Sequence, residues 1–190
     1  MIAGAGLDVE FRGSISITGT PGVGKTTLSA CLSSTLGIEV FSIESIASET
    51  QCFAGFDETD KTSLIDVDCL QTQSGYFGKN LIIEGHLSHY VPTNVIIILR
   101  CHPQELQHRL EKRGYLPTKI QNNVEWEMIG GVWTEIQELE HSASLLEFDT
   151  TNQSAEGIAI AIIERLSSGV YMDEASEVID WLDEDMQNGN

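Results

Sequence analysis

One stretch near the start of the chain has residue types and a spacing that suit phosphate binding. Residues 19–26 read Gly-Thr-Pro-Gly-Val-Gly-Lys-Thr, which matches the pattern G-x-x-x-x-G-K-[ST] of the phosphate-binding loop. Gly22 and Gly24 let the backbone curl so that successive N–H groups point into one concavity, which suits an anion. The Lys25 ammonium can reach the β- and γ-phosphates of a nucleotide, and the Thr26 hydroxyl can bind Mg²⁺.

The flanking elements support this interpretation of the loop. Residues 14–18 alternate polar and apolar side chains, several of them β-branched, which is typical of a strand. After the loop, apolar residues recur at helical spacing up to Leu36, and Gly37 suits the helix end. The N-terminus of that helix adds partial positive charge next to the loop. The alternative, a glycine-rich turn that happens to precede a lysine, does not require this strand–loop–helix context.

A second candidate site follows the apolar run 81–83, at Glu84 and His86. A short apolar run that ends in a carboxylate is typical of a buried parallel strand whose end reaches the ligand edge. Glu84 can there hold Mg²⁺ or a metal-bound water, although an acidic residue that merely begins a loop is the alternative. His86 can position or deprotonate a water molecule because its pKa lies near neutral pH. The alternative role for His86 is a backbone hydrogen bond that caps the strand.

Strands that alternate with helices predict an α/β fold with a five-stranded parallel sheet and helices on both faces. The predicted strands are 14–18, 39–43, 81–84, 95–100 and 145–148. The predicted helices include 44–53, 104–113, 122–141 and 154–166, and 54–60 is predicted as a polar turn. Ligands bind at the carboxyl edge of such a sheet, so residues 19–27, Glu84, His86, Arg100 and Asp149 should lie along one edge.

The charge of the chain is strongly acidic and unevenly placed. The 190 residues include 29 acidic and 10 basic residues, for a net charge of −19. This balance argues against a direct, sequence-specific nucleic-acid partner, which would need a basic face. It suits a basic protein partner or a high-salt cytoplasm, and a well-solvated acidic surface is the simplest alternative. Five of the ten basic residues lie between Arg100 and Lys119, which indicates a place that meets phosphate.

The chain divides by composition into three parts. Residues 1–13 are predicted to be a flexible extension, 14–169 a single domain, and 170–190 an acidic tail. An apolar stripe in the tail predicts a short docked helix; it consists of Val178, Ile179, Trp181 and Leu182. The sequence has neither a secretory signal nor an apolar run long enough to span a bilayer. We therefore expect a cytoplasmic location and no membrane partner.

The remaining residues whose side chains could bind or react are expected to have structural roles. The four cysteines have no paired spacing, so we expect small buried side chains rather than a zinc site or a disulfide framework. Four further histidines are expected to be surface or core-edge residues: His89, His102, His108 and His141. Trp126 and Trp133 are expected to pack rather than to stack on bases.

With these residues in place, the chain resembles the nucleoside monophosphate kinases, which are P-loop NTPases. It is more closely similar to the atypical adenylate kinases with ATPase activity, shared by archaea and eukaryotic nuclei, that act in small-ribosomal-subunit maturation. The resemblance covers about residues 15–166 and is carried by 17–27, 49–57, 65–66, 84–86, 109–115 and 119–127. The loop is specific only to the superfamily, whereas Glu84-x-His86 and Arg113-Gly114-Tyr115 are specific to the family.

The resemblance implies a reaction in which the γ-phosphate of ATP passes to AMP, with ATPase activity beside it. It implies that the ATP phosphates and Mg²⁺ are held by Gly22, Gly24, Lys25, Thr26 and Thr27. It also implies a monophosphate-binding part at about 42–65 and a short lid at about 112–122, from which Arg113 reaches the transferred phosphate. Lys25, Arg113, Glu84 and His86 would be catalytic, and Thr26 and Glu84 would hold the metal. Glu84 and His86 stand for the family's acidic-x-His element, which is linked to metal positioning and ATP hydrolysis.

The chain departs from the family at two positions. The family often has Asp where Glu84 stands, and its nuclear members carry an arginine, able to bind the monophosphate, where Ser48 stands. The missing cation gives weight to the alternative of an ATP-driven assembly factor whose nucleotide state controls binding to a basic small-subunit ribosomal protein. A small GTPase fits poorly because no N-K-x-D stretch occurs in the sequence.

Overall fold

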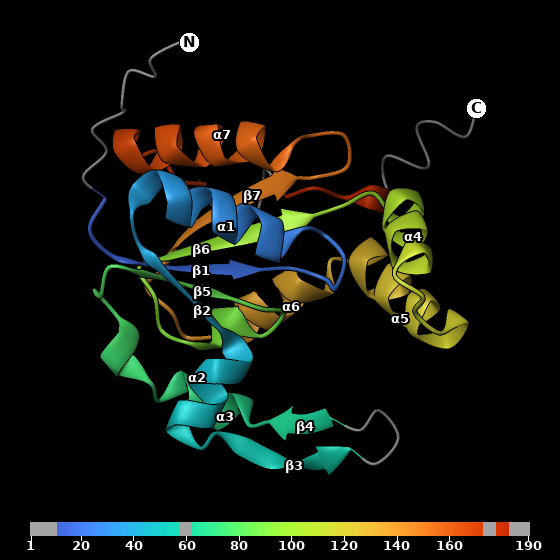
Figure 1. Ribbon diagram of the computed structural model, residues 1–190, viewed down its shortest axis with the longest axis horizontal. Helices are drawn as coiled ribbons and strands as arrows, with labels where there is room; N and C mark the ends of the chain where they lie inside the picture. Colours follow the sequence, from blue (N-terminus) through green and yellow to red (C-terminus); the bar gives the residue numbers. More distant parts are fainter. Residues whose placement is uncertain (1–10, 58–61, 173–177, 183–190) are drawn as a thin grey trace.

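A five-stranded parallel sheet forms the centre of the computed structural model, which describes residues 11–57, 62–172 and 178–182 (Figure 1). Its strands run in the order β2-β5-β1-β6-β7. Their bounds are Ser14–Thr18 for β1, Glu39–Ser42 for β2, Leu81–Glu84 for β5, Val95–Arg100 for β6 and Ser144–Asp149 for β7. The prediction of a five-stranded parallel sheet is therefore confirmed.

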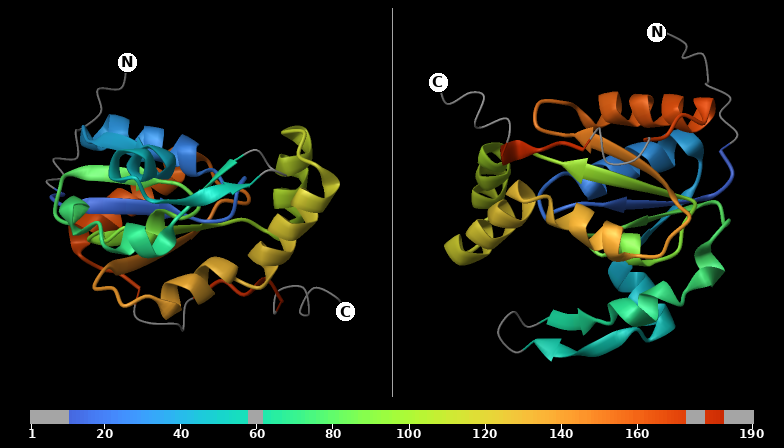
Figure 2. Two further views of the ribbon diagram at one scale, coloured as in Figure 1. Left: turned by 90° about the horizontal axis from the view of Figure 1, so that it is seen from below. Right: turned by 180° about the vertical axis from the view of Figure 1, so that it is seen from behind.

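Strand β6 explains why helices cover both faces of the sheet. All six of its residues are buried, and successive side chains of a strand point to opposite faces. Ile97 packs toward α1 (Lys25–Leu36) and α7 (Ala155–Ser168). Ile96 and Ile98 pack instead against Val132, Trp133 and Ile136 of α6 (Gly131–Glu138). Figures 1 and 2 show α1 and α7 on one face and α6 on the other.

A small subdomain projects from the sheet after β2 (Figure 2). Helix α2 (Ile43–Thr50) leads into an antiparallel hairpin of β3 (Phe53–Asp57) and β4 (Thr62–Ile65), followed by α3 (Val67–Gln71). Two short 3₁₀ turns flank β5, Ser74–Tyr76 before it and Ser88–Tyr90 after it. The expectation of a turn over 54–60 is wrong for residues 54–57, and the helix predicted to reach 53 ends at Thr50. Gln51 takes a left-handed conformation, with φ 60°, which stops the helix and turns the chain into the hairpin.

The helices beyond β6 also differ from the prediction. Helix α4 (Pro103–Lys112) lies as expected, but the single helix predicted over 122–141 is wrong. Helix α5 runs over Pro117–Met128 and ends before Gly130, whose φ of 64° breaks the helical path before α6. Gly131 is required there because a Cβ atom would lie 2.1 Å from the Trp126 ring. No helix in the described ranges is long and apolar enough to cross a membrane.

Two of the four cysteines form a disulfide, contrary to the expectation that none would. Cys52 and Cys69 are joined, with Cα atoms 5.4 Å apart, while Cys31 and Cys101 are unpaired. The Asp66 amide donates a hydrogen bond to the Cys52 carbonyl (3.1 Å) and brings the start of α3 against the start of β3. The hairpin between the two cysteines brings them together, and their separation of 17 residues in the sequence does not indicate this contact.

Candidate active site

The carboxyl ends of the strands bring the predicted site residues to one edge of the sheet. In the register of the sheet, Glu84 lies opposite Ile17 of β1 and Ser42 of β2, and Arg100 lies opposite Asp149. A cleft of about 960 Å³ opens at this edge. Its walls come from the phosphate-binding loop, the end of β5, the β3–β4 hairpin, and helices α5 and α6.

The loop at residues 19–24 has the conformation that its glycines predict. Gly22 and Gly24 have φ values of 101° and 107°, which favour glycine. A Cβ atom at Gly22 would also lie 2.9 Å from a Leu106 methyl group, so packing against α4 reinforces the requirement. Gly24 is the residue before helix α1, so the helix N-terminus faces the loop as expected.

The Lys25 side chain folds back over the loop. Its Nζ atom donates to the carbonyl oxygens of Gly19 (2.7 Å) and Thr20 (3.1 Å). Burial lowers the pKa of Lys25 to about 8, and the nearby carboxylate of Glu84 opposes that shift. An ammonium that is poorly solvated and held at the mouth of the loop gains most from an incoming anion.

Thr26 and Glu84 form the oxygen pair predicted to hold a metal. The Thr26 hydroxyl donates to the Glu84 carboxylate at 3.2 Å, across from α1 to the end of β5. No group of three or more His, Cys, Asp or Glu side chains in the described part of the chain could hold a metal ion by itself. Two hard oxygen donors beside a phosphate-binding loop suit Mg²⁺, which binds through few protein groups and the phosphates of its substrate. Thr27 is exposed on α1, outside the set of described residues that line the cleft.

His86 lines the cleft just after β5, as predicted. Partial burial and then the charge of Lys25 lower its pKa from the ordinary value, so the imidazole is neutral at pH 7. The Thr18 hydroxyl donates to the His86 carbonyl at 3.2 Å and fixes the backbone. Gly85 is required next to it because a Cβ atom would lie 2.3 Å from an Ile43 methyl group.

A buried charge network beside the loop was not predicted. The Arg100 guanidinium donates to Glu127 (2.7 Å) and Glu147 (3.0 Å), and all three side chains are at most 2% exposed. The Glu127 carboxylate also accepts a short hydrogen bond from the hydroxyl of Thr20 in the loop. The carboxylates outweigh the effect of burial and raise the pKa of Arg100. The sequence did indicate that Glu127 is buried, because it shares one helical face with the apolar residues Ile120 and Val124.

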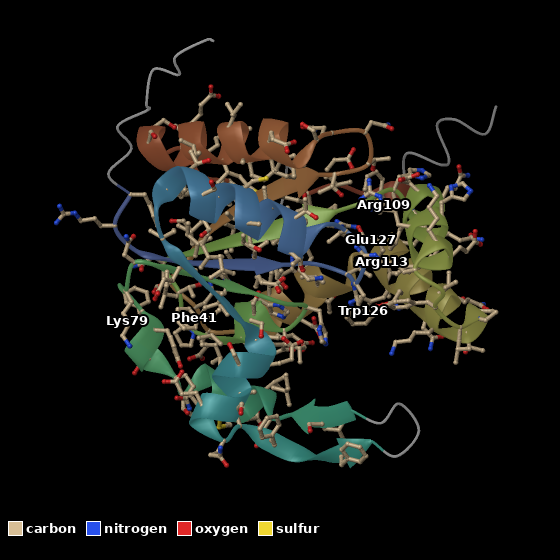
Figure 3. The ribbon with its side chains drawn as sticks, viewed as in Figure 1. Phe41, Lys79, Arg109, Arg113, Trp126 and Glu127 are labelled. Atoms are coloured by element: carbon tan, nitrogen blue, oxygen red, sulfur yellow. A yellow bond between two sulfur atoms is a disulfide. The ribbon has the colours of Figure 1, made fainter. Side chains whose placement is uncertain are left out.

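The basic cluster between 100 and 119 is divided between internal contacts and the cleft. Arg100 is buried in the network, and Arg109 donates to the carbonyls of Thr150 (2.7 Å) and Thr151 (3.0 Å). We expected this cluster to mark a place that meets phosphate, but these two arginines are bonded within the protein instead. Arg113 is exposed at the end of α4, near enough for its charge to lower the pKa of Lys25. Figure 3 shows Arg113 on the side of α4 that faces the sheet edge.

His89, expected to be a surface or core-edge residue, is buried beneath the site. Its side chain is buried, with Nδ1 2.7 Å from the Thr18 hydroxyl. Its Nε2 lies 3.4 Å from a carboxylate oxygen of Glu135, a residue that lines the cleft. His89 thus connects α6 to the end of β1 beneath the site.

The far wall of the cleft is apolar. Phe53, Leu64 and Ile65 of the hairpin line it, and Phe53 and Leu64 are 41% and 46% exposed. Trp126 of α5 lines the same cleft and is 39% exposed, while its ring lies against Gly131. The cleft therefore joins a phosphate-binding side to an apolar side, an arrangement that can hold two ligand groups of opposite character.

The fold and the phosphate-binding loop define a member of the P-loop nucleoside monophosphate kinase superfamily. A family model described as an AAA domain matches residues 15–130. Shikimate kinase from Acinetobacter baumannii has this fold, with a TM-score of 0.55 and 16% identity, over 84% of this chain and 96% of that one. Deoxyadenosine kinase from M. mycoides gives a TM-score of 0.53 and 16% identity, over 83% of this chain and 100% of that one.

Proteins of similar sequence identify the family within this superfamily. A protein from Thermococcus onnurineus is 39% identical over 173 residues, which cover 90% of this chain and 92% of the relative. One from Methanocaldococcus jannaschii is 36% identical over 170 residues, or 88% of this chain and 92% of the relative. Both carry the name "Putative adenylate kinase". The chain belongs to this family.

Proposed function

We propose that the protein transfers the γ-phosphoryl group of ATP to AMP and also hydrolyses ATP. The observation that carries the proposal is one cleft in which Lys25 and the Thr26–Glu84 pair face the apolar hairpin wall. Phosphoryl transfer needs positioning and charge neutralisation more than covalent chemistry, and such a cleft supplies both. The names of the two relatives support adenylate as the acceptor.

In this proposal each part of the cleft has a separate role. The loop amides and Lys25 hold the ATP phosphates, and Thr26 and Glu84 hold Mg²⁺, which neutralises phosphate charge when bound. Arg113 approaches the transferred group when the segment at about 112–122 closes as a lid. The base of AMP packs on the hairpin side, where Phe53 and Leu64 are exposed.

His86 separates hydrolysis from transfer. Because its pKa is lowered, the imidazole is neutral at pH 7 and can accept a proton from, or orient, an attacking water. AMP brings its own nucleophile, so transfer depends less on His86. His86→Ala should therefore keep nucleotide binding, lose most AMP-independent hydrolysis and retain more of the transfer activity.

A coupled assay of ADP formation with and without AMP tests the proposal. A large AMP-dependent rate that disappears in Lys25→Ala and Thr26→Ala, with melting temperatures unchanged, is the expected result. Wild-type turnover in either variant would overturn the assignment of the loop. Equal losses of hydrolysis and transfer in His86→Ala would remove its role in orienting water.

The second candidate is an ATP-driven factor in small-ribosomal-subunit maturation that binds a basic ribosomal protein. Its support is the net charge of −19, together with Phe56, which is 53% exposed on the hairpin. The distinguishing measurement is ATP turnover with and without a basic small-subunit ribosomal protein. Turnover that needs this protein and not AMP would favour the factor over the kinase.

A further inference from the structure

The C-terminal segment Val178–Leu182 docks on the buried charge network beside the loop. Trp181 is 2% exposed, and its indole N–H donates to the Glu127 carboxylate at 3.1 Å. The Ile179 amide donates to Glu147 at 2.8 Å, and its carbonyl accepts from Arg100 at 3.0 Å. Figure 2 shows the segment beside α4 and α5 at the carboxyl end of the sheet.

The two oxygens of Glu127 link this segment to the phosphate-binding loop. Oε1 accepts from Arg100 Nε (2.7 Å), the Cys101 amide (3.1 Å) and the Trp181 indole (3.1 Å). Oε2 accepts from the Thr20 hydroxyl in the loop. The Thr20 carbonyl in turn accepts from Lys25 Nζ. Contacts thus run without a gap from Trp181 through Glu127 and Thr20 to Lys25.

We propose that Ile179 and Trp181, in the segment Val178–Leu182, position the phosphate-binding loop through the charge network and Glu127. The inference rests on the proposed function only in requiring that a nucleotide binds at the loop. A buried carboxylate with donors on both oxygens has one orientation, since any rotation would leave a donor unpaired. Without the indole, Oε1 keeps the Arg100 and Cys101 donors but loses the third, so the carboxylate is held less rigidly and the partner of the Thr20 hydroxyl is less fixed.

The charges make the indole N–H more than a packing group. The network holds one cation, Arg100, against the carboxylates of Glu127 and Glu147. The excess negative charge is stabilised by neutral donors, among which Trp181 and Ile179 come from the C-terminal segment and Trp133 from α6 (2.5 Å to Glu147). Removing a hydrogen-bond donor from a buried charge is costly. Loss of the indole N–H should therefore loosen the orientation of the Glu127 carboxylate.

The test compares Trp181→Phe, which keeps an aromatic ring but removes the indole N–H and the five-membered ring, with Leu182→Ala, whose side chain is 46% exposed in the same segment. The measurements are the ATP and ADP affinity by calorimetry, kcat, and the melting temperature. Trp181→Phe should bind nucleotide about tenfold more weakly, the effect of losing one hydrogen bond to a charged group. Leu182→Ala should match the wild type. Unchanged affinity and kcat in Trp181→Phe, or a loss fully explained by unfolding, would overturn the proposal.

A double-mutant cycle with Thr20→Val distinguishes this linkage from a general packing role. Because Thr20→Val removes the hydroxyl, Trp181→Phe should cost no further affinity in that background, whereas Thr20→Ser should restore the wild-type response. Additive losses would show that Trp181 acts elsewhere and would refute the linkage. Nucleotide binding with no transfer to AMP would defeat the proposed function and leave this inference intact.

Discussion

Proton uptake on nucleotide binding would test the position of Lys25. In the free protein, burial lowers the pKa of Lys25 to about 8 while its Nζ bonds only to neutral loop carbonyls. Phosphate oxygens placed beside Nζ stabilise the charged form and raise that pKa. Nucleotide binding should therefore draw a proton onto Lys25 at any pH between the two pKa values.

The size of the effect follows from the free pKa of about 8. Uptake should be about 0.1 proton per nucleotide at pH 7, about 0.5 at pH 8 and about 0.9 at pH 9. Because the charged lysine binds the phosphate, affinity is full below pH 8 and falls as pH rises, by about tenfold between pH 7 and pH 9. The nucleotide phosphate, with a pKa of about 6, is already deprotonated over this range.

The assay is calorimetry with ADP at fixed Mg²⁺, in two buffers that differ in ionisation enthalpy. Lys25→Arg is the matched control, since its guanidinium remains charged over this range and should take up no proton. If the wild type took up no more protons at pH 8–9 than Lys25→Arg does, Lys25 would not meet the phosphate.

Three further predictions concern other parts of the site. Arg113→Ala should lower kcat by about 10³-fold or more and leave ATP affinity nearly unchanged, as expected of an arginine that acts in the transition state; lost affinity at constant kcat would make it a ground-state contact. Glu84→Gln should raise the Mg²⁺ concentration needed for half-maximal turnover, and an unchanged Mg²⁺ dependence would argue against its role as a ligand. The double variant Cys52→Ser/Cys69→Ser should have a free energy of unfolding about 3 kcal/mol lower, because the disulfide closes a loop with a sequence separation of 17. Denaturant titration without reductant measures the difference, and equal stability would contradict the pairing.

The parts of the fold that the sequence predicted are those with strong local signals. The loop at 19–26 and the apolar strand 95–100 each carry their pattern within a few residues, and both lie where expected. The hairpin was missed because β3 contains Gly55, at a break in the pairing register, and includes residues 54–57, which were predicted as part of a turn. The long predicted helix failed because Gly130 interrupts an otherwise continuous apolar stripe.

The partners within the buried network could not be identified from the sequence, for a different reason. A cluster of basic residues in the sequence indicates local charge, but not which side chains the fold buries. Arg100 ends a strand whose other residues are all apolar and meets Glu127 only because α5 crosses the sheet edge. The pairing of Cys52 with Cys69 likewise depends on contacts between elements and has no local pattern.

The positions of a few cations, rather than the net charge, explain how this acidic chain can bind a phosphorylated substrate. Arg100 and Arg109 are bonded internally, to carboxylates and backbone carbonyls, so they stiffen the frame of the site. Lys25 and Lys119 line the cleft itself, and Lys25 is poorly solvated. Since charges more than about 10 Å away are largely screened at physiological salt, acidic residues on the outer surface weigh little against a buried ammonium at the loop. A chain with a net charge of −19 can therefore bind an anion wherever its few desolvated cations meet the phosphate directly.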